Sequence, residues 1–407
     1  MLKNRDFNIT IATVVITVVL QFLFIRYASY GIAKVDYGNF VLLQTLIAGL
    51  SAMFLQIPGQ AFDRFYNQQT DKVMFVNEFR TMLIGINALS IFIIILYGFI
   101  YSKFSFEVLA IMFLYFVLLN NYALNQKVFL LNMQRGKYFY LKVLEASSKF
   151  LFPIVAYFYY QTLESLLVGI VVGYLFSYAV LIYFLKGYPY TLVFKWDNLK
   201  KYFLFAYPVV FVSIFTWGIS FSDRYFIDYY MTTEDVAVYS LLAMVAAIGA
   251  IVGQVYFMYA EPKILKLYEE DPHATFAMIG GYLKKLTMVF AFMSLVAVLL
   301  PKGIYTILLE KEVVYNDYYF QTMMILLVAT FINILHIAHH MYLKLLKRLD
   351  ILAYVLFVAL VVNLIGNMFI AKYGIMAAAI STLLAYITIL VLQMVYVSRY
   401  TRKELTA

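Results

Sequence analysis

The stretch DRYFIDYYMTTEDVAVYSLLAMVAAIGA, residues 223–250, reveals how this chain is organised. It follows an apolar run that begins near Tyr202, and it places Asp223, Arg224 and Asp228 within one and a half helical turns. A charged residue costs roughly 2.5–3.5 kcal/mol at the centre of a transmembrane helix and less near its end. We therefore expect a membrane helix to end here, with its charges turned away from lipid.

The composition of the whole chain predicts an all-α integral membrane protein. Of its 407 residues, 64% are hydrophobic and only 13% are charged, whereas soluble domains carry about 25% charged residues. Lipid offers no hydrogen bonds to the backbone, so the long apolar runs should be helices. The chain has no cysteine, which excludes disulfides, Cys-ligated zinc, iron–sulfur clusters and thiol nucleophiles.

The apolar runs predict twelve transmembrane helices joined by short connections. Short connections leave no room for an extramembrane catalytic domain, and the chain shows no HExxH or GxSxG motif, so we do not expect an enzyme. The predicted spans are 7–30, 37–57, 80–101, 106–125, 141–160, 165–185, 202–230, 235–259, 284–300, 318–340, 350–370 and 374–398.

The basic residues predict the orientation of these spans. With both termini on one side, 24 of the 31 Lys and Arg residues fall on that side. The positive-inside rule then places both termini in the cytoplasm of a multi-pass plasma-membrane protein. The net charge of +9 thus reflects membrane topology, and we expect no nucleic-acid partner.

An internal repeat is visible when residues 25–50 are laid on residues 223–250. Arg26 aligns with Arg224 and, after one inserted residue, Asp36 aligns with Asp235, an offset of 198–199 residues. Parallel repeats with a central site are a common transporter architecture. We expect an N-terminal six-helix half, residues 1–190, and a C-terminal six-helix half, residues 191–407, around a central cavity, with residues 185–201 as the hinge.

Three stretches resemble the polysaccharide (O-antigen type) flippases of the multidrug/oligosaccharidyl-lipid/polysaccharide exporter superfamily. They are YGIAKVDYGNFVLL (30–43), SDRYFIDYYMTTEDVAVYSLL (222–242) and VVNLIGNMFIAKYGIMAAAISTLLAYI (361–387). The chain departs from the family pattern at Ala237 and at Ala377 or Ala378, where glycine is expected. The twelve predicted spans are two fewer than the fourteen expected of the lipid II flippase branch, which favours the polysaccharide branch.

The resemblance implies a flippase of the bacterial inner membrane. Such a protein moves a polyprenyl-diphosphate-linked oligosaccharide across the membrane by alternating access, for O-antigen or other cell-surface polysaccharide biosynthesis. The expected partners are this glycan substrate, membrane lipids, and a polysaccharide polymerase and glycosyltransferases of the same pathway. No cofactor is expected beyond coupling to a proton or sodium gradient. The alternatives are an ion-coupled drug or organic-cation exporter of the same superfamily and a membrane polysaccharide polymerase.

Arg26 and Arg224 are the first candidate substrate-binding residues. An arginine fork bonds two oxygens of a diphosphate at once, and Asp223 and Asp228 are suited to hold Arg224 or to take part in ion coupling. The alternative interpretation is that these charges mark solvated helix ends.

Lys149 is the deepest basic residue in the predicted spans, about eight residues, or ~12 Å, inside a helix that begins near Leu141. Glu145 precedes it by one turn and is its expected ion-pair partner. Pro153 removes the helical donor to the carbonyl of residue 149. We interpret Lys149 as substrate-binding; the alternative is a lysine that reaches toward the interface.

Arg64, near Pro58 and Gly59, is the fourth candidate, and it would receive the diphosphate on the cytoplasmic side or merely touch lipid phosphate. His336, His339 and His340 share one helical face, and we interpret them as interfacial residues; no metal site is predicted. Asn363 and Asn367 are expected to hold neighbouring helices together.

Overall fold

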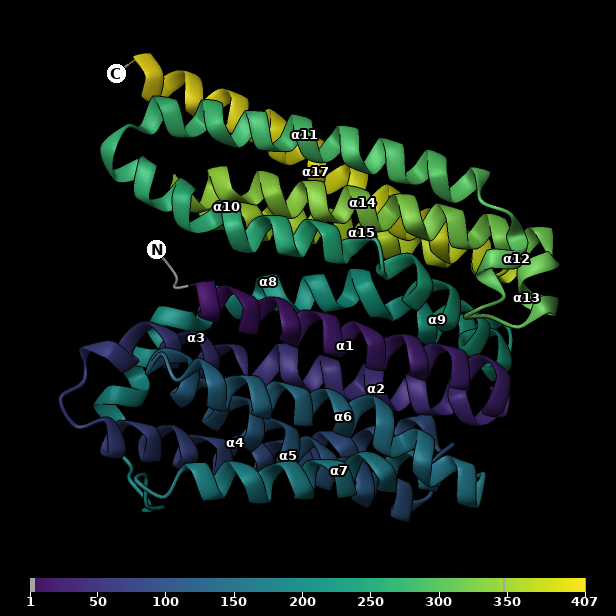
Figure 1. Ribbon diagram of the computed structural model, residues 1–407, viewed down its shortest axis with the longest axis horizontal. Coiled ribbons are helices and arrows are strands. Elements are labelled where there is room, and N and C mark those ends of the chain that lie inside the picture. The colour runs from purple at the N-terminus through teal and green to yellow at the C-terminus, as the bar shows by residue number, and fades with distance from the viewer. Residues whose placement is uncertain (1–3, 347, 407) are drawn as a thin grey trace. The chain divides into compact units, whose positions relative to one another are not determined.

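The computed structural model describes residues 4–346 and 348–406, and every regular element within them is helical (Figure 1). The elements of the first half of the chain are α1 (Asn4–Gly31), α2 (Lys34–Phe54), α3 (Gln56–Phe65), the 3-10 turn η1 (Tyr66–Gln68), α4 (Lys72–Tyr101), α5 (Phe106–Leu131), α6 (Arg135–Tyr160) and α7 (Leu163–Phe184). They are followed by α8 (Trp196–Tyr230), α9 (Thr233–Ala247), α10 (Ala250–Glu270), α11 (Pro272–Leu299), α12 (Lys302–Tyr305), α13 (Lys311–Tyr315), α14 (Asp317–Leu345), α15 (Leu349–Asn367), α16 (Ile370–Tyr373) and α17 (Ile375–Thr406).

Ten of the described helices are long and apolar enough to cross a bilayer, so the chain is an all-α integral membrane protein. They are α1, α2, α4, α5, α7, α8, α11, α14, α15 and α17. The other two predicted spans fall on α6, which carries Lys142, Glu145 and Lys149, and on the pair α9 and α10. Helix α9 has only 15 residues and is separated from α10 by Ile248 and Gly249. The predicted span 235–259 is therefore not one uninterrupted helix.

The chain divides into two compact units, Met1–Val210 and Phe211–Ala407. The division falls inside α8, which runs from Trp196 through Pro208 to Tyr230. The two halves predicted from the sequence meet at residues 190 and 191. The connection before α8 is therefore part of the first unit, together with the first turns of α8.

Close packing of α6 on α7 fixes the register of the first unit. A Cβ atom at Gly169 would lie 2.7 Å from the Phe152 carbonyl oxygen, and one at Gly173 would lie 2.7 Å from the Ser148 Cα. Small residues four apart let two membrane helices approach at backbone distance. The Ser148 and Ser177 hydroxyls add a hydrogen bond of 2.9 Å across the same contact. Helix α6, which carries two of the candidate residues, is thus held rigidly.

In the second unit, α17 packs along both α14 and α15. Gly366 of α15 faces Ser381 of α17 so closely that a Cβ atom would lie 2.4 Å from the serine Cβ. Gly374, with a φ of +64°, makes the turn between α16 and α17, a left-handed conformation that other residues rarely adopt. The resulting core is lined by apolar side chains such as Val355, Ala359 and Ile389.

The internal repeat predicted from the sequence has a counterpart in the helix boundaries. Gly31 and Tyr230 end α1 and α8, while Lys34 and Thr233 begin α2 and α9. Both boundaries are 199 residues apart, and a two-residue link joins the helices in each case. The equivalence of residues 25–50 and 223–250 therefore extends from residue types to backbone structure.

Candidate functional site

Glu145 is the centre of a charged cluster on α6. Its Oε1 accepts a hydrogen bond of 2.7 Å from Lys149 Nζ, and its Oε2 accepts one of 2.8 Å from Lys142 Nζ. Gln126 Nε2 of α5 donates a third, of 3.1 Å, to Oε2. The predicted pair of Glu145 and Lys149 is present, and Lys142 is an additional member that the prediction missed.

The cluster lies deeper along its helix than the sequence suggested. Helix α6 begins at Arg135 rather than near Leu141, so Lys149 is fourteen residues along it, or about 21 Å at 1.5 Å per residue. The helix continues through Pro153 to Tyr160 without a break. The hydroxyl of Tyr122, on α5, donates a hydrogen bond of 2.6 Å to the Leu141 carbonyl and further fixes this part of α6.

The cluster carries a surplus positive charge. Glu145 is only 8% exposed, whereas the side chains of Lys142 and Lys149 are 31% and 36% exposed. One carboxylate faces two ammonium groups, and a buried ion pair offsets its desolvation only where such hydrogen bonds are complete. Each ammonium group has three donors and donates one hydrogen bond to Glu145, so its remaining donors can attract an anion.

A second polar cluster surrounds Asp223 at the end of α8. Oδ1 of Asp223 accepts hydrogen bonds from the Arg224 backbone N–H and from Arg224 Nη1, at 2.9 and 3.0 Å. The Tyr239 hydroxyl of α9 donates to Oδ2. Arg224 Nη1 also donates to the Ser220 carbonyl at 2.8 Å. Asp223 thus compensates the charge of Arg224, as predicted.

Arg224 and its repeat-mate Arg26 have different surroundings. Arg224 is 9% exposed and lies over the Phe221 ring, whereas Arg26 is exposed and lies over the Tyr30 ring at 5.1 Å. The carboxylate of Asp228 accepts a hydrogen bond of 2.7 Å from the Thr233 hydroxyl, across the link between α8 and α9. Of these two arginines, Arg26 is the more exposed residue.

Arg64 lies on a helix of its own. It follows the predicted span 37–57, but Leu55 separates α2 from α3, and Arg64 is an exposed residue in the last turn of α3. Its neighbour Asp63 forms an ion pair of 2.8 Å with Lys127 of α5. Arg64 therefore adds an accessible positive charge at one end of the first unit.

Arg80 is the first residue of the predicted span 80–101, and the sequence did not single it out. In the structure it is buried. Its Nε donates to Asn125 Oδ1 at 2.8 Å, and its Nη1 donates to Asn77 Oδ1 and to the Tyr188 carbonyl, each at 3.0 Å. These neutral acceptors satisfy a guanidinium that, among the described residues, forms no ion pair with a carboxylate. Arg80 thereby joins α4 to α5 and to the connection that precedes α8.

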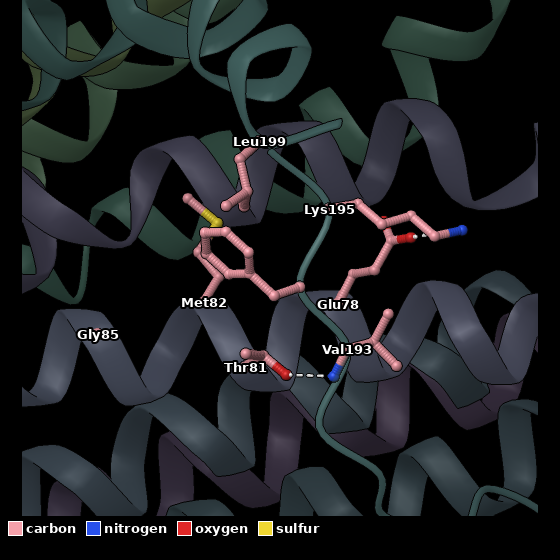
Figure 2. A pocket seen from close by; sticks show the side chains of 8 residues that line it. Glu78, Thr81, Met82, Gly85, Val193, Lys195 and Leu199 are labelled. Carbon is pink, nitrogen blue, oxygen red and sulfur yellow. Dashed lines mark hydrogen bonds and ion pairs between the residues drawn. The ribbon is translucent and has the colours of Figure 1, made fainter. Parts of the chain in front are cut away.

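Glu78 is a second buried residue of α4 that the sequence did not single out. Its carboxylate accepts hydrogen bonds from Asn198 Nδ2, at 3.0 and 2.9 Å, and from the Tyr202 hydroxyl, at 3.1 Å. Figure 2 shows Lys195 beside it, with the ammonium 3.7 Å from Oε1. Helix α4 begins at Lys72, with Asp71 as its N-cap, instead of near residue 80. The capping aspartate is the sequence signal that would have shown that Glu78 and Arg80 are helical.

Two of the three histidines of α14 that were predicted to lie at the membrane interface are buried against other residues of the protein. His336 and His339 are 8% and 9% exposed; His336 stacks on Tyr386 of α17, and His339 lies beside Tyr342.

The asparagines of α15 bind neighbouring helices, as expected. Asn367 Nδ2 donates to Ser222 Oγ of α8 at 3.4 Å, and Asn363 Nδ2 donates to Ser381 Oγ of α17 at 3.4 Å.

Comparison with known proteins identifies the fold. No protein-family model and no curated protein sequence matches the chain. Among solved structures, it is similar to the lipid II flippase MurJ in an inward closed conformation, with a TM-score of 0.74 at 14% identity over 97% of this chain and 88% of that one. It is also similar to an inward-facing multidrug resistance MATE family transporter of the MOP superfamily, with a TM-score of 0.64 at 12% identity over 96% of each chain. The eukaryotic MATE transporter AtDTX14 gives a TM-score of 0.60 at 14% identity over 96% of this chain and 93% of that one.

The chain therefore has the fold of MOP-superfamily transporters. The acronym stands for the multidrug/oligosaccharidyl-lipid/polysaccharide exporters that three stretches of the sequence resemble. These structural neighbours are transporters and flippases, not enzymes.

Proposed function

We propose that this protein is a flippase for polyprenyl-diphosphate-linked oligosaccharides of a cell-surface polysaccharide such as O-antigen. The observation that supports the proposal is the cluster of Lys142, Glu145 and Lys149. In it, the ammonium groups of two partly exposed lysine side chains outnumber one buried carboxylate. A diphosphate carries concentrated negative charge with several acceptor oxygens, which suits two ammonium groups with free donors.

The proposed role of each site residue follows from its surroundings. Lys149 binds the diphosphate, while Glu145 is its charge partner and holds both lysines in position. Arg26 and Arg64, both exposed, attract the anion before it reaches Lys149. Arg224 is a lesser contributor to binding, because Asp223 already compensates its charge.

The proposed cycle is alternating access at a bacterial inner membrane with both termini in the cytoplasm. A proton or sodium gradient drives it, and Asp223 and Asp228 are the proposed carboxylates of the coupling step. Glycosyltransferases and a polysaccharide polymerase of the same pathway would make the substrate on one side and consume it on the other. The lipid tail of the substrate remains in the bilayer.

Export in cells tests this proposal. A bacterial strain that lacks its own O-antigen flippase receives the gene, and surface polysaccharide is measured together with the amount of protein in the membrane. We expect wild-type protein to restore export and the Lys149→Ala variant to restore much less at equal protein level. Full export by the Lys149→Ala variant would refute the role given to the cluster.

The second candidate function is export of drugs or organic cations, which the similarity to multidrug MATE transporters favours. A cation exporter needs a carboxylate that is open to its substrate. Asp223 is 2% exposed and bonded to Arg224, and Glu145 is bonded to two lysines. Drug sensitivity of the same strain distinguishes the two, since only a cation exporter would raise resistance. No structural observation favours the third alternative, a polysaccharide polymerase.

A further inference from the structure

The connection between α7 and α8 forms a groove with α4. The groove has a volume of about 180 Å³, and its wall is mainly apolar. Figure 2 shows Gly85 at one end, Glu78, Lys195 and Val193 toward the other, and Met82 between them.

The roof of this groove is the connection between α7 and α8, and hydrogen bonds hold it on α4. Asn77 Nδ2 donates to the Pro189 carbonyl and to the Thr191 hydroxyl, both at 2.8 Å. The Val193 backbone N–H donates to the Thr81 hydroxyl at 3.0 Å. The connection is therefore built onto α4, and the hollow beneath it is a stable feature of the first unit.

The length of α4 locates the groove relative to a bilayer. Its 30 residues extend about 45 Å, which exceeds the hydrocarbon thickness of about 30 Å by roughly ten residues. Tyr97 and Tyr101 stack at the C-terminal end of the helix, where aromatic residues mark an interface. Counting back about 20 residues from there puts the other boundary of the hydrocarbon near Thr81. Gly85 then lies at the depth of acyl chains, and Glu78 and Lys195 lie at the depth of headgroups.

The outer surface of the connection agrees with this depth. Leu192 and Trp196 are 70% and 67% exposed. Exposed large apolar side chains suit a segment that lies at the membrane interface. Beyond Gly85, the exposed Leu89 continues the apolar surface of α4 toward the middle of the span.

The headgroup end offers a cation with spare donors. Both oxygens of Glu78 already accept hydrogen bonds from Asn198, and one accepts a second from Tyr202. Lys195 Nζ donates one hydrogen bond, of 3.2 Å, to Met74 Sδ. It is 3.7 Å from Glu78, too far for a strong hydrogen bond, and its side chain is 45% exposed. An ammonium group has three donors, so Lys195 can bind a phosphate oxygen without leaving Glu78.

We propose that the groove is a binding site for one membrane phospholipid. An acyl chain lies along Gly85 and Met82 under the roof, and the phosphodiester binds the ammonium of Lys195. This site is separate from the Glu145 cluster and does not depend on the transported substrate. Its ligand would help to seal the connection onto α4.

Gly85→Leu tests the site by filling it. A Cβ atom at Gly85 meets nothing within 4 Å, so a leucine side chain at this position begins in open space beside the groove that Gly85 lines. Gly281→Leu on α11 is the matched control, because Gly281 is also an exposed helical glycine with open surroundings. The purified full chain is reconstituted in nanodiscs of phosphatidylethanolamine and phosphatidylglycerol, released into mild detergent and examined by native mass spectrometry for retained lipid.

We expect wild-type protein and the Gly281→Leu variant to retain one phospholipid, and the Gly85→Leu variant to lose at least 80% of that adduct. A phosphatidylcholine with a diazirine on its acyl chain should label Met82 or Phe194 in wild-type protein and neither in the Gly85→Leu variant. Lys195→Gln should weaken retention without removing the acyl-chain label. The proposal is overturned if the Gly85→Leu variant retains the adduct or if the label spreads evenly along α4. None of these results depends on flippase activity.

Discussion

Lys149 and Glu145 lie one turn apart on α6 and are joined by an ion pair of 2.7 Å, while Lys142 binds the other oxygen of the same carboxylate. In this arrangement the carboxylate and the two ammonium groups have different roles. Glu145 is almost fully enclosed and serves as the anchor, whereas both lysines keep part of their surface exposed. The surplus charge on the exposed side is the basis of the function that we propose.

Lys149→Ala should lower affinity for a diphosphate by about tenfold or more, because a hydrogen bond to a charged group contributes about 1.5–3 kcal/mol. Lys149→Arg should have a smaller effect, since the charge and a donor remain. Binding of a labelled polyprenyl diphosphate to purified protein measures both. Equal affinity in the two variants and wild type would show that Lys149 only neutralises Glu145.

Arg26→Ala should slow transport without lowering stability, because the side chain is exposed. Arg26→Glu should be worse, since a negative charge repels the diphosphate that the arginine would attract. The export assay and a thermal unfolding curve for each variant give the two readouts. If the glutamate variant exports as well as the alanine variant, the charge at this position has no part in substrate capture.

Arg224→Gln should destabilise the protein because it leaves the Asp223 carboxylate buried without its cation. Breaking a buried ion pair from one side costs about 3–5 kcal/mol. The double variant Asp223→Asn with Arg224→Gln should recover part of that loss, and unfolding in detergent measures the difference. If the Arg224→Gln variant is as stable as wild type, the ion pair of Asp223 and Arg224 does not stabilise the protein.

Tyr202→Phe removes one hydrogen bond to Glu78 and should cost about 1–2 kcal/mol, because Glu78 remains buried. Tyr207→Phe is the control, since Tyr207 is exposed on the same helix. Chemical unfolding of the two variants provides the comparison. An equal effect at both positions would argue against Glu78 as the residue that fixes the start of α8.

The positive-inside rule predicts that reporter fusions after Lys201 and after the C-terminal residue both give a cytoplasmic signal. Alkaline phosphatase and a fluorescent protein at each position provide opposite readouts. A periplasmic signal from either fusion would contradict the predicted topology of the spans that precede it.

Sequence patterns were sufficient for the features that depend on neighbours along one helix. Hydropathy located ten helices that can span a bilayer, and the spacing of Glu145 and Lys149 predicted their ion pair because residues four apart share a helical face. The repeat was also readable, since Arg26 and Arg224 precede equivalent links between helices.

Features that depend on contacts between distant segments could not be read in this way. Glu78 lies 124 positions from Tyr202, so no local pattern joins them. Hydropathy places the third span at residue 80, where the apolar run begins, because the polar first turns of α4 lower the average. The connection of residues 185–201 was predicted to be a hinge between the two halves. Its bonds to Asn77 and Thr81 also join segments that are distant in sequence, so no local pattern predicts them.

Translocation in purified vesicles tests the central claim most directly. The protein is reconstituted into liposomes with a fluorescent polyprenyl-diphosphate-linked oligosaccharide, an ion gradient is applied, and label that reaches the outer leaflet is quenched with an impermeant reductant. We predict translocation well above that of protein-free vesicles, reduced about tenfold or more by Lys149→Ala, which matches the loss of one charged hydrogen bond in the transport step. The absence of translocation under both proton and sodium gradients, or equal rates in wild type and the Lys149→Ala variant, would contradict the account.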